Sequence, residues 1–424
     1  MAWPVQNRLT DAMAFASLRS FTPPFGLRRS SAPPPSGWAR NPTPERKRSR
    51  WLTTLLALGA VAALGSWTAV RFVPWFGPLV ADSLRAVLGG ERVTALEEAV
   101  ANVEDHVERA TSDGKARSLG DATPAALLDV TEPDALAPAL GHAPANVAPL
   151  YPAVAATDDG VFRPLPTRFA TSHSIYRTML HPDPERSYAE LFVFALDLAQ
   201  LSVRPVAGSV EPKADRSLPG VARPGVVPEV DRPRLVAAFN GGFKAEHGAF
   251  GMRVDGTELL RAKPYSCTVA GDDDGNLAVG TFSKLTAPSE HYAWWRQTPG
   301  CMVENGTLHP GLRSADTKNW GATIDGKTVI RRSAVGLSAD GKTLFVGISN
   351  STTARAMALG MQQAGAVTVA QLDVNFSFPR FLVYDSDPKS GALRAVGAVN
   401  GLLYTPDEYV GHASGRDFFY VTAR

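Results

Sequence analysis

The segment from Trp51 to Val70 constrains this chain more than any other, because it holds twenty consecutive residues without a charged side chain. As a helix, such a segment would span about 30 Å, which is the thickness of the hydrocarbon core of a bilayer. The sequence therefore predicts a single transmembrane helix over residues 51–70. A buried core helix and a cleaved signal peptide are the alternatives, although the apolar run of a signal peptide is usually shorter.

Basic residues gather on the N-terminal side of this segment. Residues 1–50 carry nine Lys and Arg against two acidic residues, a charge of +7, so residues 51–424 sum to −5 although the whole chain carries +2. The positive-inside rule then places the N-terminus in the cytoplasm and the C-terminal part on the extracytoplasmic side. Because the chain is also rich in Ala, Pro and Arg, we expect a single-pass protein of a bacterial cell envelope, with a periplasmic domain.

Charge and cysteine content limit the partners and cofactors. A net charge of +2 over 424 residues argues against nucleic-acid binding, which usually requires a strongly basic face. Two cysteines are too few for a disulfide scaffold or a four-cysteine zinc site, and no His/Asp cluster has the spacing of metal ligands. We therefore predict no cofactor and no metal, and the sequence does not predict an oligomeric state.

Composition divides the chain into four parts. Residues 1–50 are rich in Pro, Ser and Arg without apolar periodicity, which predicts a disordered cytoplasmic tail ahead of the anchor. Residues 71–159 are predicted to hold an amphipathic helix, residues 91–110, and then an Ala/Pro-rich linker that holds the next domain away from the membrane. The helix would pack on its own domain or form a short coiled-coil stalk. Residues 160–424 are predicted to form the functional domain.

Short runs of β-branched and aromatic residues dominate the sequence after Gly160. The clearest are residues 191–196, 234–239, 344–348, 367–372 and 381–384. Turn signals separate many of them, namely Asp255-Gly256, Asn305-Gly306, Asp325-Gly326 and Asp340-Gly341. One helix is predicted over residues 352–364, capped by Thr352 or Thr353 and ended by Gly365. We therefore expect an α+β domain with a mixed, mainly antiparallel sheet and a few helices.

Cys267 and Cys301 lie in the part of the chain that is predicted to be extracytoplasmic, where oxidation is favourable. A disulfide between them would close a loop of about 34 residues and contribute about 3–4 kcal/mol to stability. The alternative is a pair of buried thiols that pack as small apolar side chains. The sequence favours the disulfide.

Three motifs place polar groups beside apolar strands. The first, residues 240–243, reads Asn-Gly-Gly-Phe, and its glycines would let backbone amides approach a ligand. The second, residues 331–336, brings arginines into a strand of small residues, where a guanidinium can bind phosphate or carboxylate. The third places Asp373 after an apolar strand. A tight turn, the start of a surface strand and an aspartate that caps a turn are the structural alternatives.

Taken in order, these motifs resemble the phosphodiester glycosidase domain family. Residues 240–243 look like the NGGF motif of the family, and Arg332–Gly336 is similar to its R-[TS]-A-[IV]-G strand. Asp373 follows a helix and a Gly-Ala turn, as the aspartate does in the family's LDGGGS motif. The resemblance covers roughly residues 165–405. It departs after Asp373, where residues 374–378 read Val-Asn-Phe-Ser-Phe in place of the glycine-rich loop, and at Lys244, where the family often has Phe.

The resemblance implies hydrolysis of a sugar-phosphate diester or a related glycosidic bond. Arg332 would neutralise the phosphate, and Asp373 would act as the acid/base or electrostatic carboxylate. Glu246 would complete the pair of carboxylates that glycoside hydrolysis usually needs. The predicted substrate-binding residues are Asn240, Gly241, Gly242, His247, Asn375 and Ser377.

Two points keep other interpretations open. Glu246 and His247 are also typical of a polar surface loop. The loss of the glycine-rich loop, whose backbone amides could wrap phosphate oxygens, equally suits a non-catalytic domain that binds glycan or cell wall on the same scaffold. Either function predicts a glycan or sugar-phosphate ligand and attachment to a membrane.

Overall fold

The computed structural model describes residues 87–128, 143–168, 173–214, 223–285, 291–313, 320, 328–387 and 389–424, with isolated positions between residues 57 and 85. The chain separates into two units, Met1–Ala60 and Val61–Arg424, and the fold below is that of the second. The predicted cytoplasmic tail and nearly all of the predicted transmembrane segment lie outside the described residues. Within the described ranges, no helix is both long enough and apolar enough to cross a membrane.

Three sheets form the domain, and every strand pairing in the described residues is antiparallel. Sheet A has eight strands in the order β1 (Arg163–Pro164), β2 (Ile175–Leu180), β3 (Leu191–Asp197), β14 (Thr343–Thr352), β13 (Ile330–Leu337), β15 (Thr368–Val374), β11 (Val303–Glu304) and β12 (Thr307–Leu308).

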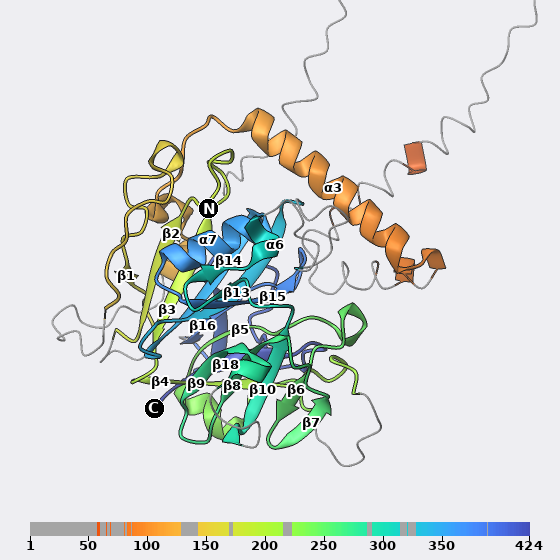
Figure 1. The fold of residues 1–424 in the computed structure, drawn as a ribbon, viewed down its shortest axis with the longest axis vertical. Coiled ribbons are helices and arrows are strands. Elements are labelled where there is room, and N and C mark those ends of the chain that lie inside the picture. The colour runs from red at the N-terminus through yellow and green to blue at the C-terminus, as the bar shows by residue number, and fades with distance from the viewer. Residues whose placement is uncertain are drawn as a thin grey trace, which may run out of the picture. The chain divides into compact units, whose positions relative to one another are not determined.

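The other two sheets have five strands each. Sheet B runs in the order β17 (Leu393–Gly397), β16 (Phe381–Ser386), β5 (Leu235–Asn240), β18 (Phe418–Ala423) and β4 (Leu201–Val206). Sheet C runs in the order β7 (Thr257–Leu260), β6 (Met252–Val254), β10 (Trp294–Thr298), β8 (Cys267–Gly271) and β9 (Leu277–Thr281). The prediction of an α+β fold with mainly antiparallel strands is confirmed (Figure 1), whereas the expected mixed sheet is not found, because all strand pairs in the described residues are antiparallel.

Helices are few and mostly short. The described α-helices are α3 (Gly90–Thr111), α4 (Leu119–Ala122), α5 (Ala125–Leu128), α6 (Pro310–Arg313) and α7 (Ala354–Gln363). Short 3₁₀ turns are η2 (Pro152–Val154), η3 (Glu229–Arg234), η4 (Ala245–His247) and η5 (Phe282–Lys284). The two longest, α3 and α7, are the two that the sequence predicts, and Thr353 caps α7 by accepting a hydrogen bond from the amide of Ala356.

The core lies between sheets A and B, with a second apolar layer under α7. Phe194 of β3 stacks on Phe381 of β16 with ring centroids 4.0 Å apart, which joins the two sheets. On its other face, sheet A is covered by α7, as Figure 1 shows. Every residue of β3, β5 and β15 is buried, because both faces of these strands are covered.

The segment predicted to be a linker contributes to this core. Leu119, Ala122 and Leu127 of α4 and α5 are buried in the same apolar cluster as the residues between sheets A and B. Helix α3 is also held on the domain, because Asp105 accepts hydrogen bonds from Arg186 and from the hydroxyl of Tyr188. The domain therefore begins before the predicted boundary at residue 160, and the amphipathic helix packs on its own domain.

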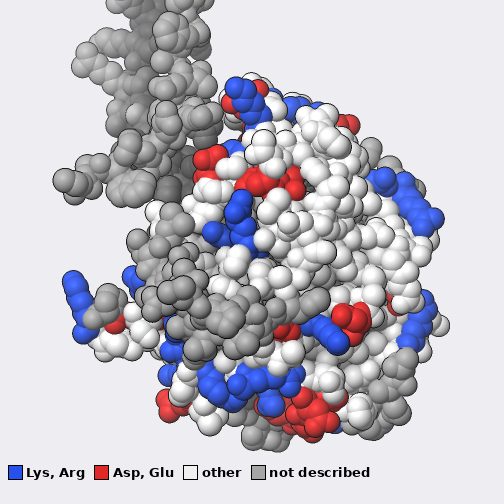
Figure 2. Space-filling view, turned by 90° about the vertical axis from the view of Figure 1, so that its left-hand side faces the viewer, with Lys and Arg blue, Asp and Glu red and all other residues white. Residues whose placement is uncertain are grey.

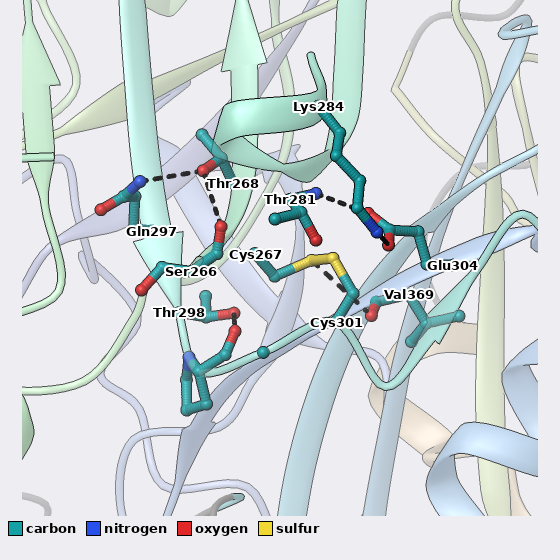
Figure 3. Close-up of a disulfide and its surroundings, with 12 residues drawn as sticks. Ser266, Cys267, Thr268, Thr281, Lys284, Gln297, Thr298, Cys301, Glu304 and Val369 are labelled. Carbon is teal, nitrogen blue, oxygen red and sulfur yellow. Dashed lines mark hydrogen bonds and ion pairs between the residues drawn. A yellow bond between two sulfur atoms is a disulfide. The ribbon is translucent and has the colours of Figure 1, made fainter. Parts of the chain in front are cut away.

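A disulfide joins sheet C to sheet A (Figure 3). Cys267, the first residue of β8, is bonded to Cys301, which lies just before β11, and the two sulfur atoms are 1.94 Å apart. Both residues are buried, and the carbonyl oxygen of Val369 on β15 lies 3.9 Å from the sulfur of Cys267. The bond thus has the pairing that the sequence favours.

Charged side chains of both signs lie among one another on the surface. Figure 2 shows one face, on which basic and acidic residues occupy neighbouring positions. This mixed surface agrees with the small net charge of the chain.

Candidate functional site

Three chain segments that are distant in the sequence meet where their strands end or begin. β5 ends at Asn240, β15 ends just after Asp373, and β18 begins just after Asp417. The amide of Gly241 donates to the carbonyl of Asp417 (2.9 Å), and the carbonyl of Gly241 accepts from the amide of Asp373 (3.1 Å). Backbone hydrogen bonds therefore place two of the predicted motifs beside a segment that the sequence did not single out.

Asp373 lies at the centre of this meeting point. Its Oδ2 accepts from Nη2 of Arg416 (2.7 Å) and from Nδ2 of Asn375 (2.9 Å), and its Oδ1 accepts from the amide of Val374 (3.0 Å). The side chains of Arg416 and Asp373 are 9% and 5% exposed, so this is a nearly buried ion pair. Three donors thus fix the position of the Asp373 carboxylate.

A bulge in β15 orients Asp373. Arg332 and Ala334 of β13 face Val374 and Gln371 of β15, respectively. The first two residues are two positions apart and the second two are three apart, so β15 has one extra residue here. A bulge of this kind redirects side chains, and bulges are frequent next to active sites. The hydroxyl of Ser333 donates to the carbonyl of Asp373 across the bulge (3.0 Å).

A second buried ion pair lies beside the first. Nε of Arg296 on β10 donates to Oδ2 of Asp417 (2.8 Å), and the same oxygen accepts from the amide of Gly242 (2.9 Å). The two side chains are 0% and 2% exposed. This pair connects sheet C to the loop after β5.

The two glycines of residues 240–243 are required by this packing. A Cβ on Gly241 would lie 2.2 Å from a carboxylate oxygen of Asp417, and a Cβ on Gly242 would lie 2.8 Å from the guanidinium carbon of Arg296. Their amides already donate to Asp417. The structure therefore uses Gly241 and Gly242 for close approach of side chains, and not for the approach of a ligand that the sequence analysis expects.

Asn240 connects the strands that form the site. Its Nδ2 donates to Oγ of Ser333 (2.8 Å) and to the carbonyl of Gly241 (3.0 Å), and its Oδ1 accepts from the amide of Arg380 (3.1 Å). The residue is 3% exposed. Its hydrogen bonds therefore position β13 and β5 relative to each other.

Arg332 does not reach Asp373. Its guanidinium is fully buried and donates to three backbone carbonyls, those of Trp320 (2.6 Å), Thr352 (3.1 Å) and Thr328 (3.3 Å). Desolvation lowers the pKa of Arg332 to about 9. Side chains alternate along a strand, so Arg332 shares a face of β13 with Ala334, which packs under α7, while Ser333 faces Asn240. The arginine that contacts Asp373 is Arg416.

The loop after Asp373 is closed by its own side chains. Oδ1 of Asn375 accepts from the amides of Ser377 (2.8 Å) and Phe378 (2.7 Å). The Phe378 ring lies over the guanidinium of Arg416, with the guanidinium carbon 4.5 Å from the ring centroid. The carbonyl of Ser377 accepts from Arg380 (2.7 Å). Side-chain contacts thus replace the glycine-rich loop of the family that the sequence resembles.

Glu246 and His247 form the more exposed part of the site. Their side chains are 52% and 43% exposed, and His247 Nε2 lies 3.5 Å from Glu246 Oε1. Although His247 is partly exposed, desolvation of the rest of its side chain lowers its pKa below the usual value; the charges of Asp373 and Glu246 partly oppose this shift, and those of Arg85 and Arg416 add to it. The start of this loop contacts the Asp373–Arg416 pair, because the carbonyl of Gly242, four residues before Glu246, accepts from Nη2 of Arg416 (3.1 Å). Ala249, two residues on, has a φ of 42°, a strained conformation that is common at functional sites.

Sequence analysis missed Arg296, Arg416 and Asp417. A sequence signal for Arg416 and Asp417 exists, because the two residues stand directly before the apolar run of β18. Polar residues at the start of a buried strand mark a strand end in the same way as Asn240, which follows the apolar run of β5. Arg296 is hidden within β10, next to two tryptophans. Among the described residues, no group of three or more His, Cys, Asp or Glu is placed to hold a metal ion.

Neither a protein-family model nor a curated protein sequence matches this chain. Among solved structures, a hypothetical protein from Synechocystis has a TM-score of 0.39 and 12% identity over 60% of this chain and 63% of its own. The auto-inhibited catalytic domain of zebrafish N-acetylglucosamine-1-phosphodiester α-N-acetylglucosaminidase has a TM-score of 0.38 and 13% identity over 73% of this chain and 97% of its own.

A third structure, of a protein from Burkholderia pseudomallei, has a TM-score of 0.31 and 11% identity over 55% of this chain and 74% of its own. The present chain thus spans less than two thirds of the Synechocystis protein. All three TM-scores are below 0.5, so these likenesses carry no argument about function. The function proposed below is therefore argued from the side chains of this chain.

Proposed function

We propose that this chain is a hydrolase of sugar-phosphate diesters or related glycosidic bonds, held on the extracytoplasmic side of a membrane by residues 51–70. The observation that carries the proposal is the Asp373–Arg416 pair at the meeting point of β5, β15 and β18, with Arg416 bonded to Gly242 of the segment that leads into the exposed Glu246–His247 loop. The membrane attachment rests on the sequence pattern of the N-terminal region.

The chemistry of a sugar-phosphate bond suits these groups. Water attacks the anomeric carbon, the carbon–oxygen bond to phosphate breaks, and its electrons leave with the phosphate monoester. A phosphate monoester is a weakly basic leaving group, so a positive charge can stabilise it without a proton donor. Arg416 donates to Asp373 and Gly242 from Nη2 alone, and Nη1 donates to no described residue, so Nη1 can contact the phosphate.

Asp373 and His247 have complementary roles in this scheme. The fixed negative charge of Asp373 stabilises positive charge that develops on the sugar ring in the transition state. His247 is neutral at neutral pH because its pKa is lowered, so its imidazole can accept the proton of the attacking water. Glu246, which neighbours His247, orients the ring and favours the imidazolium once the proton has been transferred.

The test is turnover of a panel of sugar 1-phosphate methyl diesters by the full chain in detergent. The full chain is needed because α4 and α5 contribute to the core. We expect release of methyl phosphate from at least one sugar, and loss of that activity in Asp373→Asn. Equal activity in Asp373→Asn and the wild type would overturn the assignment of the site.

One observation favours a second candidate, a non-catalytic glycan-binding domain. The Phe378 ring lies on the guanidinium of Arg416, and Asn375 closes the loop that bears this ring. An aromatic ring offers a large apolar surface, on which the C–H face of a sugar can pack. Saturable binding of a sugar diester without any turnover over the whole panel would support this candidate and exclude the hydrolase.

A further inference from the structure

Arg223 has an unusual environment next to the candidate site. Its Nε and Nη2 are both buried and have no hydrogen-bond partner among the described residues. Leaving a buried N–H without a partner is unfavourable, so a pair of such groups on one guanidinium requires an explanation, such as a water molecule or a ligand that binds there. These two nitrogens form one edge of the guanidinium, which donates two parallel hydrogen bonds to a pair of oxygen atoms.

Backbone contacts place Arg223 beside the segment that carries the site residues. The carbonyl of Gly225 accepts from the amide of Ser414 (2.7 Å), two residues before Arg416. A Cβ on Gly225 would lie 2.5 Å from the carbonyl oxygen of Ser414, so the two segments are in close contact. Glu211 reaches the same segment, because its amide donates to the carbonyl of Gly415 (2.8 Å).

Glu211 completes this environment. It is 6% exposed, and its Oε2 accepts from the amides of Lys213 (3.0 Å) and Ala245 (3.1 Å), so it also supports the loop that carries Glu246 and His247. Its Oε1 accepts no hydrogen bond from a described residue. Glu211 and Arg223 are not in ion-pair contact. Both residues belong to segments that contact residues 414 and 415, and Oε1 of Glu211 and the two nitrogens of Arg223 have no partner among the described residues.

The charges select the kind of ligand group. Burial lowers the pKa of Arg223, whereas the carboxylates of Glu211 and Asp417 raise it. The two carboxylates therefore contribute negative potential at the guanidinium. That potential disfavours a second anion at this place. The neighbouring hydroxyl groups of a sugar ring fit better, because each oxygen can accept from Arg223 while a hydroxyl hydrogen is donated to Glu211.

We propose that Arg223 and Glu211 form a subsite for two neighbouring hydroxyl groups of a sugar ring, adjacent to the Asp373–Arg416 pair. This inference rests on the proposed function, since it names the residues that would recognise the sugar part of the ligand. Arg416 would recognise the phosphate part, and Arg223 the ring. The two arginines thus have separable effects on binding.

The experiment compares two ligands by calorimetry on the full chain in detergent. One is the best-bound of the methyl esters of the C-glycosyl methylphosphonates of glucose, galactose and mannose, in which a methylene group replaces the anomeric oxygen so that the bond cannot be hydrolysed. The other is the methyl ester of cyclohexylmethylphosphonate, which has the same ring size without hydroxyl groups. We expect Arg223→Ala to weaken the sugar ligand at least tenfold and to leave the cyclohexyl ligand within twofold. Arg223→Lys, which keeps the charge and loses the paired donors, should weaken the sugar ligand at least fivefold.

Two further variants complete the design. Glu211→Gln retains an acceptor for the amides of Lys213 and Ala245 and should weaken the sugar ligand about threefold. Arg204→Ala removes an exposed arginine of β4 and should change neither affinity. Thermal unfolding of each variant shows whether it is folded. If Arg223→Ala does not fold, Arg223→Lys takes its place in the comparison.

Three results would overturn the subsite. These are a wild type that does not prefer any of the sugar ligands, Arg223 variants that bind both ligands as the wild type does, and Arg223 variants that lose both ligands equally. The proposed function is tested separately by turnover. If the Arg223 variants lose affinity for the sugar ligand only and the wild type shows no turnover, the subsite is supported and the hydrolase is excluded. If the wild type shows turnover and the Arg223 variants bind the sugar ligand as the wild type does, the hydrolase is supported and the subsite is excluded.

Discussion

The start of β13 and the segment before β18 each carry an arginine next to an apolar strand, and the two side chains are used differently. Arg332 is fully buried and donates to backbone carbonyls under α7. Arg416 donates to the carboxylate of Asp373, and the Phe378 ring lies over it. The first arginine completes hydrogen bonds within the fold, whereas the second joins a carboxylate close to an exposed loop. The comparison shows that the partner from another strand, more than the local sequence, decides what a buried arginine does.

The strongest test of this comparison is Arg416→Ala. Loss of the group that stabilises the leaving phosphate should lower kcat/KM about 10²–10³-fold, the range typical for one electrostatic contact to a transition state. Arg416→Lys should recover part of the activity, because it keeps the charge. Turnover of a sugar 1-phosphate methyl diester measures both effects. Wild-type activity in Arg416→Ala would place the site elsewhere.

Arg332→Met should lower the stability of the fold and leave the activity nearly unchanged. The change removes the guanidinium donor from the carbonyls of Trp320, Thr352 and Thr328, of which Trp320 keeps a hydrogen bond from Gln371, so the free energy of unfolding should fall by about 3 kcal/mol. Urea denaturation of the full chain measures it. The folded fraction should retain kcat/KM within about threefold. A stable variant that has lost activity would return Arg332 to the catalytic role that the sequence analysis gives it.

The disulfide between Cys267 and Cys301 is a third place, after Arg416 and Arg332, at which a substitution should change the stability of the domain. Replacing both cysteines, Cys267→Ser with Cys301→Ser, should lower the free energy of unfolding by about 3 kcal/mol, because the unfolded chain loses a cross-link that closes a loop of 34 residues. Urea denaturation with and without a reducing agent measures this change. The reducing agent should destabilise the wild type and have no effect on the double variant. A double variant as stable as the oxidised wild type would contradict the prediction.

The smallest effect concerns pH. The pKa of His247 is lowered from its usual value of 6.5, so the imidazole is neutral at pH 7 and becomes protonated only at lower pH. If neutral His247 is the base, kcat/KM falls as pH drops through this pKa, to about one tenth at one unit below it. His247→Gln should remove this acidic limb together with most of the activity. An unchanged acidic limb in His247→Gln would assign the titration to another group.

The sequence predicts those parts of the fold that depend on neighbouring residues, namely turns and helix ends. Asp255-Gly256 and Asn305-Gly306 are hairpin turns in which all four residues have positive φ, as such pairs prefer. Helix α7 begins at the Thr cap and ends before Gly365, whose φ is 114°. The arrangement of three sheets could not be predicted, because it depends on contacts between strands that are far apart in the sequence, such as β3 with β14.

The candidate site divides in the same way. The positions of Asp373 and Asn240 at strand ends follow from local patterns, because an apolar run that stops at a polar residue marks the end of a buried strand. Arg416 is 43 residues from Asp373, and no local pattern connects them. The described helices α4 and α5 within the predicted linker pack in the core of the domain. Leu119 and Leu127 lie among alanines and prolines without apolar periodicity, and their burial depends on sheets formed later in the chain.

The position of β18 has a consequence for folding. β18 follows the other described strands in the sequence, yet it lies in the interior of sheet B, between β5 and β4, and the residues just before it supply Arg416 and Asp417. While β18 is unpaired, sheet B lacks the strand that joins β4 to β5, and each of the two buried ion pairs lacks one member. Sheet B and the candidate site therefore cannot be completed before β18 pairs with its two neighbours.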